Sequence, residues 1–246
     1  MKEPSAAENG NFGGPFAPDR QEDGRFRRVS NHQKLFAELL EERAALAGDI
    51  CEFGVYEGAC TRDLARLAPN RRIYAFDTYS GMPVKEFDAK LDHDEPGKFT
   101  PTATPGEMFA GFPNIVSVVG HFEDTMPAIP ADVRFVLAYL DCDLYESYRQ
   151  IYEWLPPRLL ENAAIIIDDY VICRGCQVAT DAFIKQYGLT FVDQKLIVWP
   201  KIDLCVECRH AFTDHSTGIL DAEDSIYYFP CKIAGCHCCP DQLVKA

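Results

Sequence analysis

The sequence lacks several features that would place it in a large class of proteins. None of its apolar runs approaches the roughly 18 to 20 residues that cross a bilayer, and its first residues carry no apolar block of a signal peptide. Basic side chains are also few, because 24 Lys and Arg stand against 38 Asp and Glu, which gives a formal charge of -14. Phosphate binding needs clustered Lys and Arg, so we expect no nucleic-acid partner and no anionic membrane. We expect a soluble, cytoplasmic protein.

A dinucleotide-binding glycine pattern is absent too. The motif G-x-G-x-x-G does not occur, which disfavours a nicotinamide-dependent dehydrogenase. What the chain does have is 246 residues, 47% of them hydrophobic and 25% charged, enough to bury a full core in one domain. The oligomeric state does not follow from these numbers, so a homo-oligomer stays open.

The chain divides into three parts by composition. Residues 1–29 are rich in Gly, Pro, Asn and charge without periodicity and are expected to form a disordered tail. Residues 30–200 are expected to form the main domain. Six of the eleven cysteines fall in residues 201–246, which therefore read as an appended Cys/His-rich element.

Strands and helices are expected to alternate in the main domain. A helix is expected from residue 30, with a stop at Gly48, and two more over 60–68 and 146–155. Near-continuous apolar runs at 49–55, 71–77, 114–120, 133–141 and 163–169 suit strands that are covered on both faces. This order predicts an α/β fold with a doubly wound, mostly parallel sheet, whose sites lie at the carboxyl ends of the strands.

Two segments leave alternatives open. The stretch from Thr78 to Pro113 contains five prolines and an acidic cluster, and it reads either as a lid or specificity loop or as a solvated insertion. After Gly188, "LTFVD" and "LIVWP" could form a closing hairpin, whereas "SIYYFP" at 225–230 could equally supply the last strand of the sheet.

A glycine turn follows the first expected strand. In "EFGVYEG", Gly54 and Gly58 allow a ligand to approach the backbone closely, and the next helix offers its N-terminus. Asp77 ends the second expected strand, where a carboxylate can accept hydrogen bonds from both hydroxyls of a ribose. Together these features favour a nucleoside-containing ligand over an ordinary turn and a surface carboxylate.

Two aspartate pairs end later strands. Asp141 and Asp143 close one strand, and Asp168 and Asp169 close another about one crossover later. Ends of adjacent strands lie about 5 Å apart, so four carboxylates could converge there. Like charges so close need a counterion, and oxygen ligands suit a hard cation such as Mg²⁺. The pairs therefore favour a metal site over helix caps and solvated side chains.

These segments together resemble a known enzyme family. "GDICEFGVYEGACT", "IYAFDTYSGMP", "GHFEDTMP", "LDCDLYESY" and "IIIDDY", in this order over about residues 30–185, are similar to the macrocin O-methyltransferase family. Its members are class I, Rossmann-like enzymes that use S-adenosylmethionine and Mg²⁺ to methylate sugar hydroxyls of natural products. The chain departs from the family at Ala59 and Cys60, where members often have Gly and Ser.

The resemblance assigns roles residue by residue. It implies a Mg²⁺ site at Asp141, Asp168 and Asp169, with Asp143 as the general base. It also implies a methyl-donor site formed by Glu52, Gly54, Gly58, Asp77 and, near the adenine, Phe122.

The function expected is therefore Mg²⁺-dependent methylation of a hydroxyl on a sugar or another vicinal diol, since two adjacent hydroxyls can chelate the metal. The alternative is a non-catalytic nucleoside-binding interaction module with a zinc-binding C-terminal element.

Further cysteines and aromatic residues carry weaker signals. Cys205, Cys208, Cys236 and Cys239 form two C-x-x-C pairs with 27 residues between them, and four thiolates suit a zinc ion. A reduced, cysteine-rich tail is the other interpretation. A third pair, Cys173 and Cys176, is expected in a loop with incidental thiols. His121, Tyr145 and Tyr170 could edge the site or simply pack.

Overall fold

The computed structural model describes residues 31–200 of the chain. The expected tail at 1–29 and the Cys/His-rich element at 201–246 lie outside the described residues, and so do the four proposed zinc ligands, Cys205, Cys208, Cys236 and Cys239. The alternative last strand at 225–230 also lies outside them.

Helices and strands alternate through the described part. The helices are α1 (Asn31–Glu42), α2 (Ala59–Leu67), α3 (Pro105–Met108), α4 (Phe122–Thr125), α5 (Tyr145–Trp154) and α6 (Arg174–Tyr187). The strands are β1 (Asp49–Phe53), β2 (Ile73–Asp77), β3 (Ile115–Val119), β4 (Phe135–Leu140), β5 (Leu159–Ile167) and β6 (Leu196–Val198). Short 3₁₀ helices lie at Val84–Glu86 (η1), Met126–Ala128 (η2), Pro156–Arg158 (η3) and Asp168–Val171 (η4).

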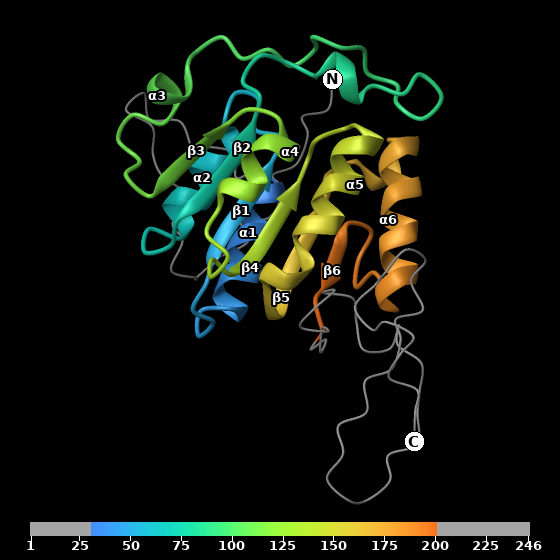
Figure 1. The fold of residues 1–246 in the computed structure, drawn as a ribbon. Coiled ribbons are helices and arrows are strands. Elements are labelled where there is room, and N and C mark those ends of the chain that lie inside the picture. Colours follow the sequence, from blue (N-terminus) through green and yellow to red (C-terminus); the bar gives the residue numbers. More distant parts are fainter. Residues whose placement is uncertain (1–30, 201–246) are drawn as a thin grey trace, which may run out of the picture.

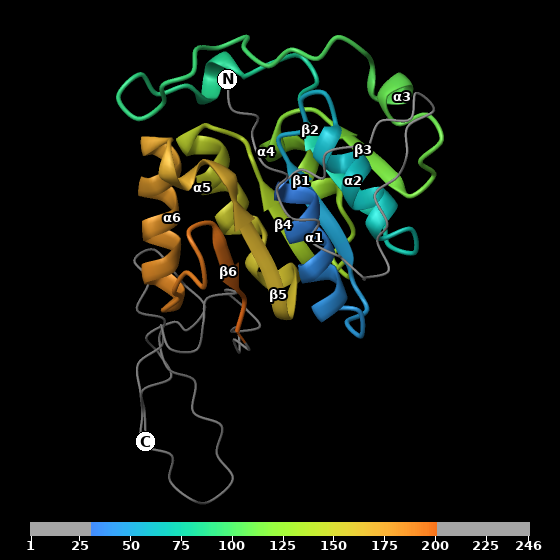
Figure 2. The ribbon, with the colours of Figure 1, turned by 180° about the vertical axis from the view of Figure 1, so that it is seen from behind.

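The strands described form a single sheet in the order β3-β2-β1-β4-β5-β6. Neighbouring strands from β3 to β5 run parallel, and β6 pairs with β5 in the antiparallel direction. In Figures 1 and 2, α1 and α2 cover one face of the sheet, while α4, α5 and α6 cover the other. The expected doubly wound, mostly parallel α/β fold is confirmed.

The core forms on both faces of the sheet because side chains alternate along each strand. In β4 all six residues are buried, so the strand shows no polar alternation. Leu137 and Tyr139 pack with Phe36 of α1 and Leu64 of α2, whereas other residues of β4 pack against the opposite helices. Burial on both faces explains the continuous apolar runs in the sequence.

The chain reverses its winding direction between β1 and β4, and this is where ligands bind in open α/β sheets. Phe53 of β1 is paired with Leu140 of β4, which is in turn paired with Ile167 of β5. The three strands therefore end level, and the residues that follow them meet at one edge.

The segment between β2 and β3 crosses that edge. It runs along the top of the molecule in Figure 1, above the carboxyl ends of the strands, and contains η1 and α3. Asp92 is buried and accepts a hydrogen bond at 2.8 Å from the backbone N–H of Tyr145, at the start of α5. The segment is thus docked onto the domain, which fits a lid or specificity loop better than a solvated insertion.

Three local features differ from expectation. The prediction of a loop around Cys173 and Cys176 is wrong. Cys173 is the N-cap of α6, Cys176 lies in the first turn of that helix, and both cysteines are buried. Strand β5 begins at Leu159, four residues before the expected start at residue 163. Leu159 pairs with Phe135 of β4, and the register between β4 and β5 shifts before the next pair. After Gly188, the run "LIVWP" supplies β6, whereas "LTFVD" contributes only a single bridge, at Asp193, to Leu196.

One glycine is required by the close approach of β1 and β4. Gly54 has a φ of +85°, and a Cβ added there would lie 1.8 Å from the carbonyl oxygen of Asp141. Both the backbone conformation and the space exclude a side chain at this position.

We predict that Gly54→Ala destabilises the protein more than Gly97→Ala does. Gly97 also has a positive φ, of +83°, but its added Cβ would meet nothing within 4 Å. Urea unfolding should give a loss of about 1–2 kcal/mol for Gly97→Ala, from backbone strain alone. Gly54→Ala should lose at least about 2 kcal/mol more, since the backbone collision adds to the strain. Equal losses would contradict the close approach.

Candidate active site

A cavity of about 420 Å³ opens at the carboxyl edge of the sheet, among the loops that follow β1, β2, β4 and β5. It contains most of the residues singled out from the sequence: Glu52, Gly54, Asp77, Phe122, Asp141, Asp143, Asp168 and Asp169. Gly58 is not among the lining residues; it is the N-cap of α2, with a φ of 69°. The strand ends therefore bring the two expected half-sites into one cavity.

Three carboxylates form a candidate metal centre. Asp141 follows β4, and Asp168 and Asp169 open η4 directly after β5. Each offers one oxygen such that the three oxygens lie within 4.8 Å of one another. Oxygen ligands converging in this way suit a hard divalent cation.

Each of these carboxylates is held by a neighbouring hydrogen-bond donor. The hydroxyl of Tyr139 lies 3.2 Å from Asp141 Oδ2, and that of Tyr148 lies 2.8 Å from Asp169 Oδ2. A carboxylate has two oxygens, so these bonds orient the side chains and leave capacity to ligate a cation.

Asp168 is held by two side chains from distant parts of the chain. Lys195, which precedes β6, donates to its Oδ1 at 2.7 Å, and Nε2 of His32 in α1 lies 3.0 Å from the same atom. Burial of Asp168 opposes ionisation, but the bonds from His32 and Lys195 outweigh it and lower the pKa of this carboxyl. In return, the bond to Asp168 raises the pKa of His32.

The other carboxylates experience the opposite effect. Burial, followed by repulsion from Asp169 and Asp168, raises the pKa of Asp141 to about 7. Burial also raises the pKa of Asp169. Negative charges held this close and this deep favour a positive partner, which a divalent cation between them would provide.

Asp143 lies beside the three carboxylates but is not one of the converging set. Its backbone N–H donates to Asp169 Oδ2 at 2.9 Å, and its φ of 60° turns the chain sharply after β4. Burial, followed by the charges of Asp169 and Asp141, raises the pKa of Asp143 to about 8. Asp143 is thus half-buried beside the three converging carboxylates but separate from them.

The glycine turn after β1 is braced by Asp77. One oxygen of this carboxylate accepts from the backbone N–H groups of Val55 at 2.7 Å and Tyr56 at 3.1 Å. The other accepts from the N–H of Tyr79 at 2.7 Å. The same oxygen lies 3.5 Å from the hydroxyl of Thr78, so four donors of the chain face this carboxylate, and Asp77 shapes the turn.

Glu52 is a buried carboxylate at the end of β1, with 1% of its surface exposed. Its Oε2 has no hydrogen-bond partner among the described residues, although Glu52 lines the cavity. Burial raises the pKa of Glu52 to about 8. An unpaired buried acceptor at a cavity wall indicates a ligand donor that completes it.

Backbone strain gathers at the same edge. Tyr56, Phe99 and Asp143 line the cavity, and all three have positive φ values, of 49°, 57° and 60°. Such conformations cost free energy in residues other than glycine and are concentrated at functional sites.

Of His121, Tyr145 and Tyr170, only His121 lines the cavity. His121 lines the cavity, and its Nδ1 lies 3.1 Å from Oε1 of the buried Glu86, whose second oxygen accepts from Ser147 at 2.7 Å. Tyr170 donates to Asp181 at 2.8 Å and contacts Phe191, and it does not line the cavity. Tyr145 likewise stays outside the lining.

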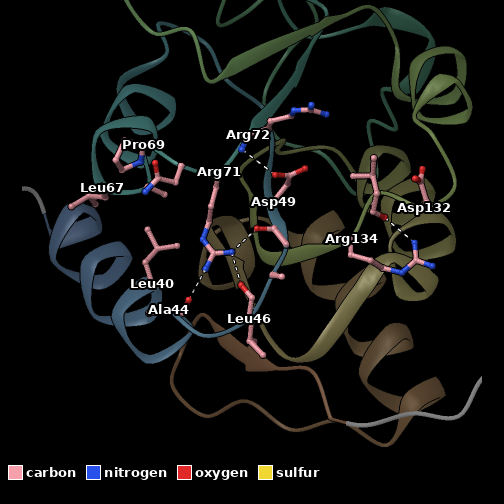
Figure 3. Close-up of a pocket in the computed structure, with 15 residues that line it drawn as sticks. Leu40, Ala44, Leu46, Asp49, Leu67, Pro69, Arg71, Arg72, Asp132 and Arg134 are labelled. Atoms are coloured by element: carbon pink, nitrogen blue, oxygen red, sulfur yellow. Dashed lines mark hydrogen bonds between the residues drawn. The ribbon is translucent and has the colours of Figure 1, made fainter.

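A larger cavity, of about 770 Å³, lies at the opposite edge of the sheet (Figure 3). Its central side chain, Arg71, donates to backbone carbonyl oxygens, including those of Leu46 at 2.7 Å and Gly48 at 2.5 Å. This arginine closes the loop between α1 and β1, so its role is structural. None of the candidate site residues lines this second cavity.

Within residues 31–200, no helix combines the length and the apolar character needed to traverse a membrane.

Comparison with known proteins identifies the family. A family model described as Macrocin-O-methyltransferase (TylF) matches residues 24–201. The 8-demethyl-8-(2,3-dimethoxy-alpha-L-rhamnosyl)-tetracenomycin-C 4'-O-methyltransferase of Streptomyces olivaceus is 31% identical over 183 residues, which are 67% of each chain. The demethyldecarbamoylnovobiocin O-methyltransferase of Streptomyces niveus is 26% identical over 195 residues, 71% of this chain and 73% of the relative.

Solved structures support the fold. The calicheamicin methyltransferase CalS11 has a TM-score of 0.59 at 24% identity, covering 71% of this chain and 81% of its own. The O-methyltransferase NovP has a TM-score of 0.56 at 22% identity, covering 69% and 78%.

We predict that Glu52→Gln stabilises the protein without bound ligand, and more so at high pH. Burial raises the pKa of Glu52 from its ordinary value of 4.5 to about 8 in the folded protein. Between pH 4.5 and pH 8, the folded state therefore holds a proton that the unfolded state has lost. The stability from this group is present below pH 4.5 and is lost as the pH rises toward 8. Glutamine cannot ionise, so urea unfolding should show a gain over wild type of about 2–4 kcal/mol at pH 8.5 and less at pH 5.5.

The exposed Glu161 provides the matched control. Glu161→Gln should show the same small difference from wild type at both pH values. A Glu52→Gln gain that does not grow with pH would contradict the buried, protonated carboxyl.

Proposed function

This chain belongs to the macrocin O-methyltransferase family and is an S-adenosylmethionine-dependent O-methyltransferase, and from this premise we propose that it methylates a hydroxyl of a sugar or another vicinal diol with the help of Mg²⁺. The observation that carries the proposal is the convergence of Asp141, Asp168 and Asp169 within 4.8 Å in the same cavity as the glycine turn after β1. The sugar acceptor is supported by the rhamnosyl group in the name of the Streptomyces olivaceus relative. Family membership argues against the non-catalytic binding module.

The donor half of the cavity is formed by the ends of β1 and β2 and the start of α4. Glu52 offers an unpaired buried oxygen, and Gly54 and Gly58 place no side chain of their own between the backbone of the turn and a ligand. We assign the ribose hydroxyls to Asp77 and the adenine to Phe122, since both residues line the cavity. S-adenosylmethionine supplies a methyl group that its sulfonium has already activated.

The acceptor half is formed by the ends of β4 and β5. The carboxylates of Asp141, Asp168 and Asp169 would hold Mg²⁺. Each of them accepts a hydrogen bond that fixes its orientation, from Tyr139, Lys195 and Tyr148 respectively, as is typical of metal ligands. When bound, Mg²⁺ supplies Lewis acidity that lowers the pKa of an acceptor hydroxyl.

The chain's own contribution to the transfer is alignment and proton removal. The two halves adjoin because β1 and β4 are neighbours, so acceptor oxygen, methyl carbon and sulfur can be held in line. Asp143, which follows β4 by three residues, would accept the proton of the acceptor hydroxyl, while the hydroxyl oxygen takes the methyl group and the carbon–sulfur bond of the donor breaks to leave S-adenosylhomocysteine.

We predict that Asp141→Asn and Asp168→Asn each abolish measurable turnover, because an amide is a poorer ligand for Mg²⁺ than a carboxylate. Calorimetry with S-adenosylhomocysteine should give a donor-site affinity within about threefold of wild type, since these side chains lie in the other half of the cavity. Binding of Mn²⁺, followed by electron paramagnetic resonance, should be lost in both variants. Asp181→Asn is the control: Asp181 bonds to Tyr170 outside the cavity, so neither measurement should change. Full turnover of either metal-site variant, or of wild type in excess chelator, would exclude the metal mechanism.

We predict a different result for Asp143→Asn. Removal of the base should lower kcat by about 10²–10⁴-fold, whereas Mn²⁺ and S-adenosylhomocysteine should bind as in wild type. A kcat close to that of wild type would remove Asp143 from the reaction.

A further inference from the structure

The backbone of Asp143 is bonded on both of its polar sides to the chain that follows β5. Its N–H donates to Oδ2 of Asp169, in the first turn of η4, at 2.9 Å. Its carbonyl oxygen accepts from the thiol of Cys173, the N-cap residue of α6, at 2.7 Å. We infer that Cys173 is a positioning residue for methyl transfer, which holds the backbone of Asp143 so that the Asp143 carboxylate reaches the proton of the acceptor hydroxyl. This inference rests on the proposed function, in which Asp143 is the base.

The conformation of Asp143 makes such a contact necessary. Its φ of 60° lies in the left-handed region, which costs free energy in a residue that has a Cβ. Asp143 also lies between the end of β4 and the start of α5, so no helix or strand fixes it. A bond to its carbonyl oxygen restricts rotation of the peptide and, with it, the direction of the side chain.

The two bonds to the backbone of Asp143 differ in what else they touch. Oδ2 of Asp169 also accepts from the hydroxyl of Tyr148 at 2.8 Å, and Asp169 belongs to the candidate metal centre. A change at Asp169 would therefore disturb the cation ligands as well as the base. Cys173 does not line the cavity, so its thiol touches no substrate and acts on the reaction through Asp143.

The thiol of Cys173 is suited to this contact. Cys173 is fully buried in an apolar cluster that includes Tyr148 and Phe183, where a thiol packs as a small hydrophobic group. Burial raises the pKa of Cys173 to about 11, so the thiol keeps its proton at neutral pH and can donate it. The Cys173 backbone is itself fixed, because its N–H donates to the carbonyl oxygen of Asp169 at 2.8 Å and its carbonyl oxygen accepts from Gln177 at 3.0 Å.

Three variants separate the contact from general packing. Cys173→Ala removes the donor, whereas Cys173→Ser keeps a hydroxyl that can donate to the same carbonyl oxygen. Cys51→Ala is the control, because Cys51 is equally buried and its thiol also donates to a backbone carbonyl, that of Leu137, at 3.9 Å. Leu137 lies within β4, away from the turn that carries Asp143.

Hydrogen exchange of the full-length protein, followed by mass spectrometry, tests the contact without any acceptor. The N–H groups of Asp143, Leu144 and Tyr145 are all bonded within the protein, so they report on local opening of this turn. In Cys173→Ala they should exchange about tenfold faster than in wild type, and in the other two variants within about twofold of wild type. Unchanged exchange in Cys173→Ala would overturn the inference.

Kinetics test whether the contact serves the reaction. The full-length enzyme is assayed with Mg²⁺, labelled S-adenosylmethionine and whichever 4-nitrophenyl glycoside of L-rhamnose, D-glucose or D-galactose the wild type methylates fastest. Cys173→Ala should lower kcat about tenfold, with both KM values and Mn²⁺ binding within about twofold of wild type. Cys173→Ser should restore most of kcat, and Cys51→Ala should leave it unchanged. A loss that serine does not restore, or that Cys51→Ala shares, contradicts a positioning role.

A double variant shows through which group Cys173 acts. When Asp143→Asn has already removed the base, Cys173→Ala should lower kcat by less than about twofold more. A further tenfold loss in that background would exclude Cys173 as a positioning residue for Asp143 and leave the proposed function intact.

Two results would instead strike the proposed function and, with it, this inference. One is a kcat of Asp143→Asn close to that of wild type, and the other is methyl transfer by the wild type to none of the three glycosides.

Discussion

The register of β1, β4 and β5 is the constraint on which the rest of the site depends. Phe53, Leu140 and Ile167 are paired in one row across the sheet, so the three strands end at the same level. Gly54 must then pass the carbonyl of Asp141, and Asp168 must follow on the other side of β4. A slip of one strand by one residue would turn its last side chains to the opposite face and separate the carboxylates. The hydrogen bonds of the sheet thus fix the distances of the site before any ligand is present.

Several features of the site lower the stability of the folded protein. Glu52 is buried with an unpaired oxygen, Asp141 and Asp143 are held among other negative charges, and three non-glycine residues of the cavity carry positive φ values. The surrounding core offsets these costs, since both faces of the sheet are packed with apolar side chains. The packing of the strands thereby holds these carboxylates together at one edge of the sheet.

The sequence predicted the strands well because burial on both faces leaves an uninterrupted apolar signal, as in β4. Because strand ends of a parallel sheet share one edge, it also predicted that four carboxylates could converge there; three of them do, and Asp143 lies beside them. It missed the start of α6, because Gly175 is a poor helix former; the glycine is explained by the close approach of Asp92, which is far away in sequence. The two side chains that bond to Asp168 could not be predicted for the same reason: His32 lies 136 residues from Asp168, and no local pattern marks such a contact. The alternatives for the segment between β2 and β3 could be separated only by its docking on α5.

The two side chains that bond to Asp168 come from the beginning and the end of the described chain. His32 lies in the first helix, and Lys195 immediately precedes the last described strand. During synthesis on the ribosome, the sheet strands β1, β4 and β5 all emerge before Lys195 does. Asp168 therefore gains its ammonium partner only when the antiparallel strand β6 is about to be added. A nascent chain that stops short of Lys195 therefore lacks the ammonium group that bonds to Asp168, and the negative charge of its carboxylate cluster is less compensated.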